Sequence, residues 1–305
     1  KLDVKQPNNK EENMASADFN DFNFRVTIKN ENKIYKNSKI GLDVFDKWNN
    51  SKKIFRYMNR VSFTSPKPEY PFRIDLSIVK ASTKNDKGIM MQTYNIDESN
   101  VFKNQEFFEI EVEVLPTAKN IFKTNIELSN ALQKVLKDVL CGLQKTNYPI
   151  SYPEQKETLQ HYHRLLFEDD YVKKGETYIP KERIYPSDFI GPSLVTLGVQ
   201  NIGPLNPDFI VPNITEPFAY CVTEKADGDR HLLYINSTGK IYLINMNMTV
   251  IFTGAKTMEE KCFNSLLDGE LILHDKLRNF INTFAAFDIY YINNVDIRAR
   301  PFINT

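Results

Sequence analysis

Four residue types suited to phosphate chemistry stand close together in Thr223–Arg230, directly after an apolar run. Lys225 has the position of a nucleophile at the end of a strand. A lysine attacks phosphorus only as the neutral amine, so its pKa must fall from about 10.4 through desolvation and nearby positive charge, from Arg230 or a metal ion. Gly228 permits a tight turn that brings Asp227 and Arg230 back towards Lys225. The alternative is a charged hairpin turn, because Asp-Gly is common between strands.

Two later stretches carry acidic groups inside apolar, strand-like runs. Leu266–Leu273 holds an acidic pair around a glycine, and its second acid is Glu270. Phe284–Tyr291 holds Phe287 followed by Asp288. Either run alone is also typical of a core strand. The order of the lysine segment and these two strands favours a shared site.

This order resembles the covalent nucleotidyltransferase superfamily of mRNA capping guanylyltransferases and ATP-dependent polynucleotide ligases. The resemblance implies that Lys225 takes up a nucleoside monophosphate as a phosphoramidate and expels pyrophosphate. It implies that Arg230 and Glu270 handle ribose and metal and that Phe287 packs on the base. The nucleotide-binding set expected from it is completed by Asp227, Gly228 and Asp288.

The first half of the chain shows alternating polar and apolar residues, which predicts strands near residues 22–29, 54–64, 72–80 and 107–115. In the last of these, Glu109, Glu111 and Glu113 project from one face about 7 Å apart. The earlier strands carry arginines on their polar faces. A barrel with these faces inward would hold acids on one wall for metal and bases on another for phosphate oxygens. The alternative is a solvated charged face.

These strands resemble the tunnel-type, metal-dependent RNA triphosphatases, above all those at the front of capping enzymes from large cytoplasmic DNA viruses and cytoplasmic linear plasmids. The resemblance covers residues 22 to about 168. It implies that Mg2+ or Mn2+ is bound by Glu111 and Glu113 with Glu109, and that the triphosphate is clamped by Arg56, Arg60, Arg73 and Lys80. Lys80 has the parity of the apolar face, so it serves the polar face only past the strand end or beyond a bulge. A second Glu-x-Glu pair, usual on an early strand, is missing from Lys1–Asn20.

We therefore expect an α+β chain: an antiparallel β-tunnel of the triphosphate tunnel metalloenzyme type, then the N-terminal part of a covalent nucleotidyltransferase domain. The expected boundaries are a polar tail at 1–21, the tunnel at 22–168, a proline-rich linker at 169–217 and the incomplete nucleotidyltransferase domain at 218–305. Helices are predicted at Asn125–Leu143 and Pro153–Phe167. The superfamily has later strands and a closing domain, so we expect a larger protein.

The composition bears on how the chain can bind phosphate and in which compartment it is expected. Lys plus Arg and Asp plus Glu both number 39, so any phosphate-binding surface must be local. Three scattered cysteines fit a reducing compartment, and no apolar run is long enough for a membrane span. The expected location is cytoplasmic, in a viral factory, a virion or plasmid-bearing cytoplasm.

The leading functional expectation is mRNA 5′-capping: removal of the γ-phosphate from pppRNA, then transfer of GMP from GTP through lysyl-GMP to ppRNA. The expected partners are the 5′ end of nascent RNA, GTP, a cap methyltransferase domain or subunit and an RNA polymerase, with no membrane. One alternative is an ATP-dependent RNA or DNA ligase with a lysyl-AMP intermediate. Another is a capping-complex subunit with an inactive tunnel.

Overall fold

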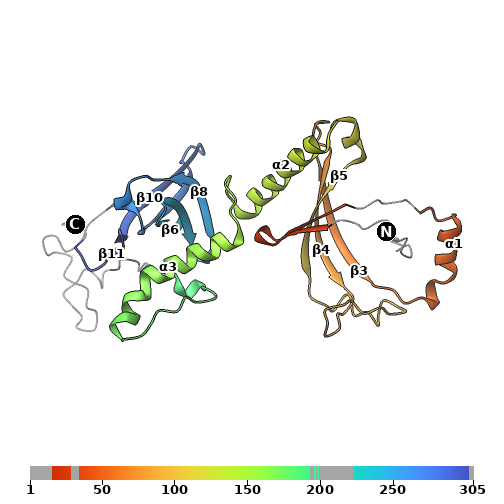
Figure 1. Ribbon diagram of the computed structural model, residues 1–305, viewed down its shortest axis with the longest axis horizontal. Helices are drawn as coiled ribbons and strands as arrows, with labels where there is room; N and C mark the ends of the chain where they lie inside the picture. Colours follow the sequence, from red (N-terminus) through yellow and green to blue (C-terminus); the bar gives the residue numbers. More distant parts are fainter. Residues whose placement is uncertain (1–15, 29–33, 193–195, 197, 199–222, 302–305) are drawn as a thin grey trace. The chain divides into compact units, whose positions relative to one another are not determined.

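The structure is a computed structural model that describes residues 16–28, 34–192, 196, 198 and 223–301. The chain folds into two compact units, residues 1–19 with 24–139 and residues 20–23 with 140–305, and Figure 1 draws both. This division lies earlier in the chain than the predicted boundary near residue 168. Part of the predicted linker falls on residues outside the described ranges, and so does the whole apolar run 218–222. Among the described residues, no helix has the length and apolar character that would cross a bilayer.

The N-terminal unit contains the predicted strands. Strands β3 (Arg56–Thr64), β4 (Phe72–Ala81) and β5 (Phe107–Val114) form an antiparallel sheet in the order β3-β4-β5. Strands β1 (Ser16–Phe19) and β2 (Phe24–Thr27) form a separate hairpin. The end of the predicted tail is therefore strand, because Ser16–Phe19 pairs with β2. By their hydrogen bonding, the described strands form these two sheets and do not close into a tunnel.

Strand β4 is buried on its polar face and half-exposed on its apolar face. Asp75 and Ser77 are buried, whereas Leu76 and Ile78 are 41% and 39% exposed. Side chains of β3 and β5 cover this polar face. Arg60 of β3 reaches across it and donates hydrogen bonds to Asp75 of β4 and Glu111 of β5. This inward polar face agrees with the predicted alternation.

Two helices complete the N-terminal unit and its boundary. Helix α2 (Asn125–Gln144) confirms the predicted helix and spans the junction between the units. The short helix α1 (Lys39–Asp46) was not predicted. Its start is set by Ser38, whose hydroxyl accepts a hydrogen bond from the backbone N–H of Gly41 at 3.1 Å.

The C-terminal unit is one antiparallel sheet covered on one face by a helix. Its order is β11-β10-β9-β6-β7-β8, with bounds β6 (Asp229–Ile235), β7 (Lys240–Asn245), β8 (Val250–Lys256), β9 (Ser265–His274), β10 (Phe280–Ile292) and β11 (Val295–Asp296). Edge strand β8 was missed by the sequence reasoning. Its last residues include Gly254 at φ 79°, which interrupts the alternation of polar and apolar residues by which a strand is recognised in the sequence.

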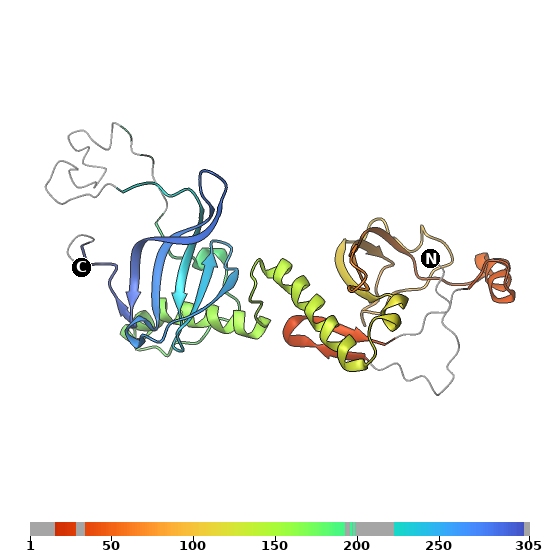
Figure 2. The same cartoon turned by 90° about the horizontal axis from the view of Figure 1, so that it is seen from above.

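Helix α3 (Tyr152–Lys173) lies along this sheet (Figure 2). Ser151 caps its start by accepting from the N–H of Glu154, and Pro153 occupies the first turn. Tyr162 and Leu166 pack against sheet residues such as Leu232 and Leu266 in one buried core. The predicted helix is confirmed and is longer than expected, but it packs in the C-terminal unit.

The hydroxyl of Tyr162 joins helix α3 to the segment that follows it. It donates to the carbonyl of Asp188 at 2.8 Å and accepts from the N–H of Ile190 at 2.9 Å. Tyr162 is fully buried, so these backbone groups have no water to replace the hydroxyl. The residues around 190 are thereby fixed to the helix.

Replacing Tyr162 by Phe should therefore destabilise the protein by about 1–3 kcal/mol, because two buried backbone groups lose their partner. Urea unfolding followed by fluorescence measures this loss. The control is Tyr152→Phe, at an exposed position on the same helix, which should change the free energy of unfolding by less than about 0.5 kcal/mol. Equal effects of the two substitutions would contradict the anchoring role.

Candidate functional site

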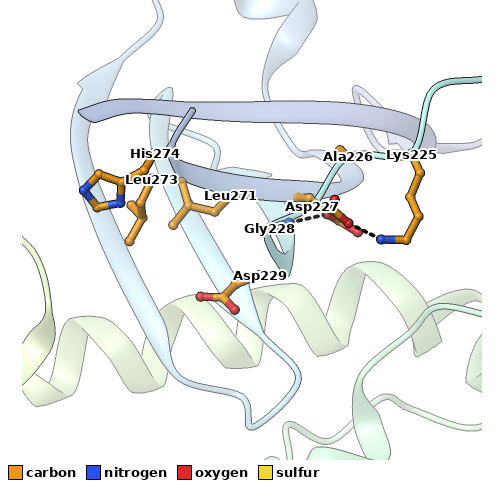
Figure 3. A pocket seen from close by; sticks show the side chains of 9 residues that line it. Lys225, Ala226, Asp227, Gly228, Asp229, Leu271, Leu273 and His274 are labelled. Atoms are coloured by element: carbon orange, nitrogen blue, oxygen red, sulfur yellow. Dashed lines mark hydrogen bonds and ion pairs between the residues drawn. The ribbon is translucent and has the colours of Figure 1, made fainter. Parts of the chain in front are cut away.

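The predicted lysine segment lines a pocket at one end of the C-terminal sheet. Lys225 and Asp227 lie in the extended segment just before β6, and the pairing of Arg230 with Glu270 brings strand β9 alongside. The pocket measures about 470 Å³. It is lined by Lys225, Ala226, Asp227, Gly228, Asp229, Glu270, Leu271, Leu273 and His274, and Figure 3 shows most of them. The structure thus brings together Lys225, Asp227, Gly228 and Glu270 of the predicted set.

Gly228 ties the lysine segment to strand β9. Its backbone N–H donates to Oε2 of Glu270 at 2.8 Å. A Cβ at this position would stand 2.6 Å from the carbonyl oxygen of Leu271. The expectation of a turn that needs glycine is therefore replaced by a close approach of two backbones, because Gly228 is not among the residues with positive φ. Glu270 thereby fixes the segment that carries Lys225.

Lys225 forms an ion pair with Asp227, and both residues line this pocket (Figure 3). Its side chain is 81% exposed. The hydrogen bond and charge of the Asp227 carboxylate raise the pKa of Lys225 above its ordinary value. The predicted lowering of this pKa is therefore not found in this arrangement, since burial is slight and Arg230 does not line the pocket.

Arg230 is instead held in a buried network behind the pocket. Its Nε donates to Oδ1 of Asp268 at 3.1 Å, and a second nitrogen donates to Oδ2. The hydroxyl of Tyr290 donates to the same Oδ2 at 2.5 Å. Asp268 is 0% exposed. The hydrogen bond that Arg230 donates to Asp268 outweighs burial and raises the pKa of Arg230 above its ordinary value, so the guanidinium stays charged.

The anchored segment after helix α3 closes the other side of Arg230. The guanidinium donates to the carbonyl of Pro192 at 2.9 Å and lies 5.8 Å from the centroid of the Phe189 ring. Gly191 has φ 155°, and a Cβ there would stand 2.4 Å from a guanidinium nitrogen. Glycine is therefore required at this position by contact as well as by conformation. Arg230 is enclosed from both sides.

Sequence reasoning did not identify Asp268 and Tyr290 as residues of the site. The alternation of the strand could have identified Asp268. It lies two residues from Leu266 and so shares its inward face, which places an acid in the core. A buried carboxylate needs a cation, and the register supplies Arg230.

Phe287 and Asp288 lie on β10 and do not line the pocket. The pairing of β10 with β9 shifts between Ala286 and Asp288, so Phe287 is the extra residue of a β-bulge. Its ring is partly exposed. The predicted contact of Phe287 with a base stays a prediction, and so does the nucleotide-binding role of Asp288.

The N-terminal unit pairs each predicted acid with a predicted base. Arg56 binds Glu109 at 2.6 Å, Arg60 binds Glu111 at 2.5 Å and Arg73 binds Glu113. Acids and bases were expected on opposite walls. They are interleaved on one wall because β3, β4 and β5 are direct neighbours.

Asp75 is the centre of this charged face and was missed as a site residue. It accepts from Arg60 at 2.8 Å and from Arg73 at 3.1 Å. Burial would raise its pKa, but the Ser62 hydroxyl and the two guanidinium groups outweigh burial and hold the pKa below its ordinary value. The network is therefore organised around a buried carboxylate.

Lys80 lies on the face opposite Arg73. The pairing of β3 with β4 is regular through Tyr57 and Lys80, without the bulge that the clamp would need. The ammonium group instead lies 3.5 Å from the Glu106 carboxylate. The arrangement does not support a clamp shared by Lys80 and the three arginines.

The described residues do not fit a divalent cation as they stand. In the described ranges, no three His, Cys, Asp or Glu side chains gather as a metal site. Each of Glu109, Glu111 and Glu113 is paired with a guanidinium group, which competes with a cation for the carboxylate.

Two comparisons relate this chain to known proteins. Residues 213–305 match the family model described as mRNA capping enzyme, catalytic domain. The chain is also 28% identical over 248 residues to a probable mRNA-capping enzyme of Acanthamoeba polyphaga mimivirus. That similarity covers 80% of this chain and 16% of the viral protein's length. The family match contains the whole lysine pocket.

Asp268→Asn should destabilise the protein by about 3–5 kcal/mol, because it leaves the largely buried Arg230 without its counter-charge. The matched control is Asp296→Asn, which removes another bidentate aspartate–arginine pair whose carboxylate is 41% exposed. It should cost about 1 kcal/mol or less. Urea unfolding of both variants gives the comparison, and equal losses would contradict a special role for the buried pair.

Proposed function

We propose that the C-terminal unit transfers GMP from GTP to the 5′-diphosphate end of RNA through a covalent intermediate on Lys225. The main support is the pocket in which Lys225, Asp227, Gly228 and Glu270 meet, within the region that matches the capping enzyme family. A lysine in such a pocket has the chemistry of a nucleophile for an activated phosphate.

In the first step, neutral Nζ of Lys225 attacks the α-phosphorus of GTP. An N–P bond forms, the bond from the α-phosphorus to the bridging oxygen breaks, and pyrophosphate leaves. The amine must first lose a proton, and Asp227 is the carboxylate within hydrogen-bond reach. Because the Asp227 carboxylate stabilises the ammonium form, we infer that nucleotide binding separates Lys225 from Asp227 and that the ammonium then gives its proton to solvent.

In the second step, a terminal β-phosphate oxygen of ppRNA attacks the same phosphorus. The N–P bond breaks, Lys225 regains a proton, and GpppRNA is released. Both steps demand an in-line approach, and misplacement by about 1 Å can cost 100-fold in rate. The hydrogen bond between Gly228 and Glu270 restrains the segment that sets this approach.

For the N-terminal unit we propose binding of the RNA 5′-triphosphate on the charged face of β3, β4 and β5. Phosphate oxygens accept from guanidinium groups as carboxylates do, so a triphosphate would compete for Arg56, Arg60 and Arg73. Displaced carboxylates of Glu109, Glu111 and Glu113 would then be free for Mg2+ or Mn2+. The existing ion pairs also favour a second candidate, an inactive scaffold in a capping complex.

The partners of the whole protein belong to this proposal as well. They are the RNA 5′ end and GTP, with a cap methyltransferase domain or subunit and an RNA polymerase. The viral relative fits a cytoplasmic setting of virus replication.

Lys225→Ala should abolish the covalent adduct formed with GTP labelled at the α-phosphate, because no lysine remains in the described lining of the pocket. Lys225 is exposed, so the fold should persist. Lys256→Ala, at an exposed lysine on β8, is the control and should leave the adduct intact. A parallel reaction uses ATP labelled at the α-phosphate. An adduct with ATP but not with GTP would indicate a ligase instead.

Glu113→Ala should remove most phosphate release from pppRNA, because it removes one of the carboxylates proposed to bind the metal. The GMP adduct should be unchanged, because it forms in the other unit. Glu106→Ala is the matched control, since Glu106 is equally exposed and lies outside the charged face. Full phosphate release by Glu113→Ala, or none by the unmodified protein, would favour the scaffold.

A further inference from the structure

The hairpin between β9 and β10 extends past the rest of the C-terminal sheet (Figure 2). Strand β6 pairs with β9 only as far as Leu271. Beyond it, His274 pairs with Phe280 across the hairpin. We call residues 274–280 the β9–β10 tip. His274 lines the pocket, so the tip begins where the pocket ends.

The tip has a defined turn. Asp275 accepts from the N–H groups of Leu277 and Asn279, each at 2.8 Å, and from the side-chain amide of Asn279 at 2.9 Å. The hydrogen bond from that amide lowers the pKa of Asp275. Both carboxylate oxygens of the tip's one acid are therefore used inside the turn.

The remaining tip residues present cations and apolar surface to solvent. Lys276 and Arg278 are exposed and form no ion pair with a described residue. Phe280 is 69% exposed and Leu277 is 82% exposed. The Phe280 ring is braced edge-on by His274, with ring centroids 5.6 Å apart. The tip thus offers a supported aromatic face next to two positive charges.

We propose that the β9–β10 tip binds the first nucleotides of the single-stranded RNA that accepts the nucleotide at Lys225. Exposed aromatic rings flanked by Lys and Arg bind single strands, because bases stack on the ring and phosphates meet the cations. With the acceptor's 5′ end in the pocket, the nucleotides that follow can reach the tip past Leu273 and His274, which line the pocket on the tip side. The inference rests on the proposed function.

The test measures RNA affinity of the full-length protein with a 3′-labelled, 5′-diphosphate oligoribonucleotide of about 10 nucleotides. Phe280→Ala should weaken binding about fivefold to 100-fold, as expected for one lost base stack, and Phe280→Tyr should restore it. Arg278→Ala should reduce the slope of log affinity against log salt by about 0.7, because one phosphate contact is lost.

Met258→Ala and Lys256→Ala are the controls, since Met258 is as exposed as Leu277 and both residues lie at the β8 edge of the same sheet. They should bind RNA as the unmodified protein does. Equal losses in controls and tip variants, or unchanged affinity and salt slope in both tip variants, would overturn the proposal and leave the tip as a protein contact. GMP adduct formation without RNA tests the proposed function separately, so the two failures are distinguishable.

Discussion

The buried pair of Arg230 and Asp268 is the constraint on which the C-terminal unit depends. An isolated charge in this core would be prohibitively costly, so each group requires the other in place. The pair fixes β6 against β9, and this register sets Gly228 against Glu270. The same guanidinium holds the backbone near Pro192, which Tyr162 ties to helix α3. Helix, sheet and lysine segment thus converge on one ion pair.

The two units use arginine–carboxylate contacts in different ways. In the C-terminal unit, one pair is enclosed and rigid, and it supports the pocket from behind. In the N-terminal unit, two of three arginines share one buried acid and each of the three pairs with a partly exposed glutamate, so several oxygens remain within reach of solvent. The first arrangement is suited to holding a backbone in position. The second is suited to exchanging one anion for another.

The sequence predicted well what depends on local pattern. Alternation located β3, β4 and β5, and helical periodicity located α2 and α3. It could not predict that Arg60 meets Asp75 and Glu111, because those contacts depend on strand register. Motif order predicted that Lys225 and Glu270 share a site, but the strand of Phe287 and Asp288, expected there too, does not line the pocket. The pairing of Arg230 with Asp268 depends on neighbours in three dimensions. Short elements such as α1 and β1 carry too few residues for a clear period.

The inverted burial of strand β4 bears on how its sheet finds its alignment during folding. In most sheets with one buried face, a slip by one residue is prevented because it would expose the hydrophobic set. Here a slip of β4 against β3 would move half-exposed Leu76 and Ile78 inward and carry Asp75 away from Arg60 on β3. The contact of Arg60 with Asp75 therefore adds a charge constraint on the alignment to the burial of Val79 on the same face. Ionic strength during refolding becomes a determinant of fidelity in this sheet, and guanidinium salts, which imitate its arginines, become specific competitors for its acids.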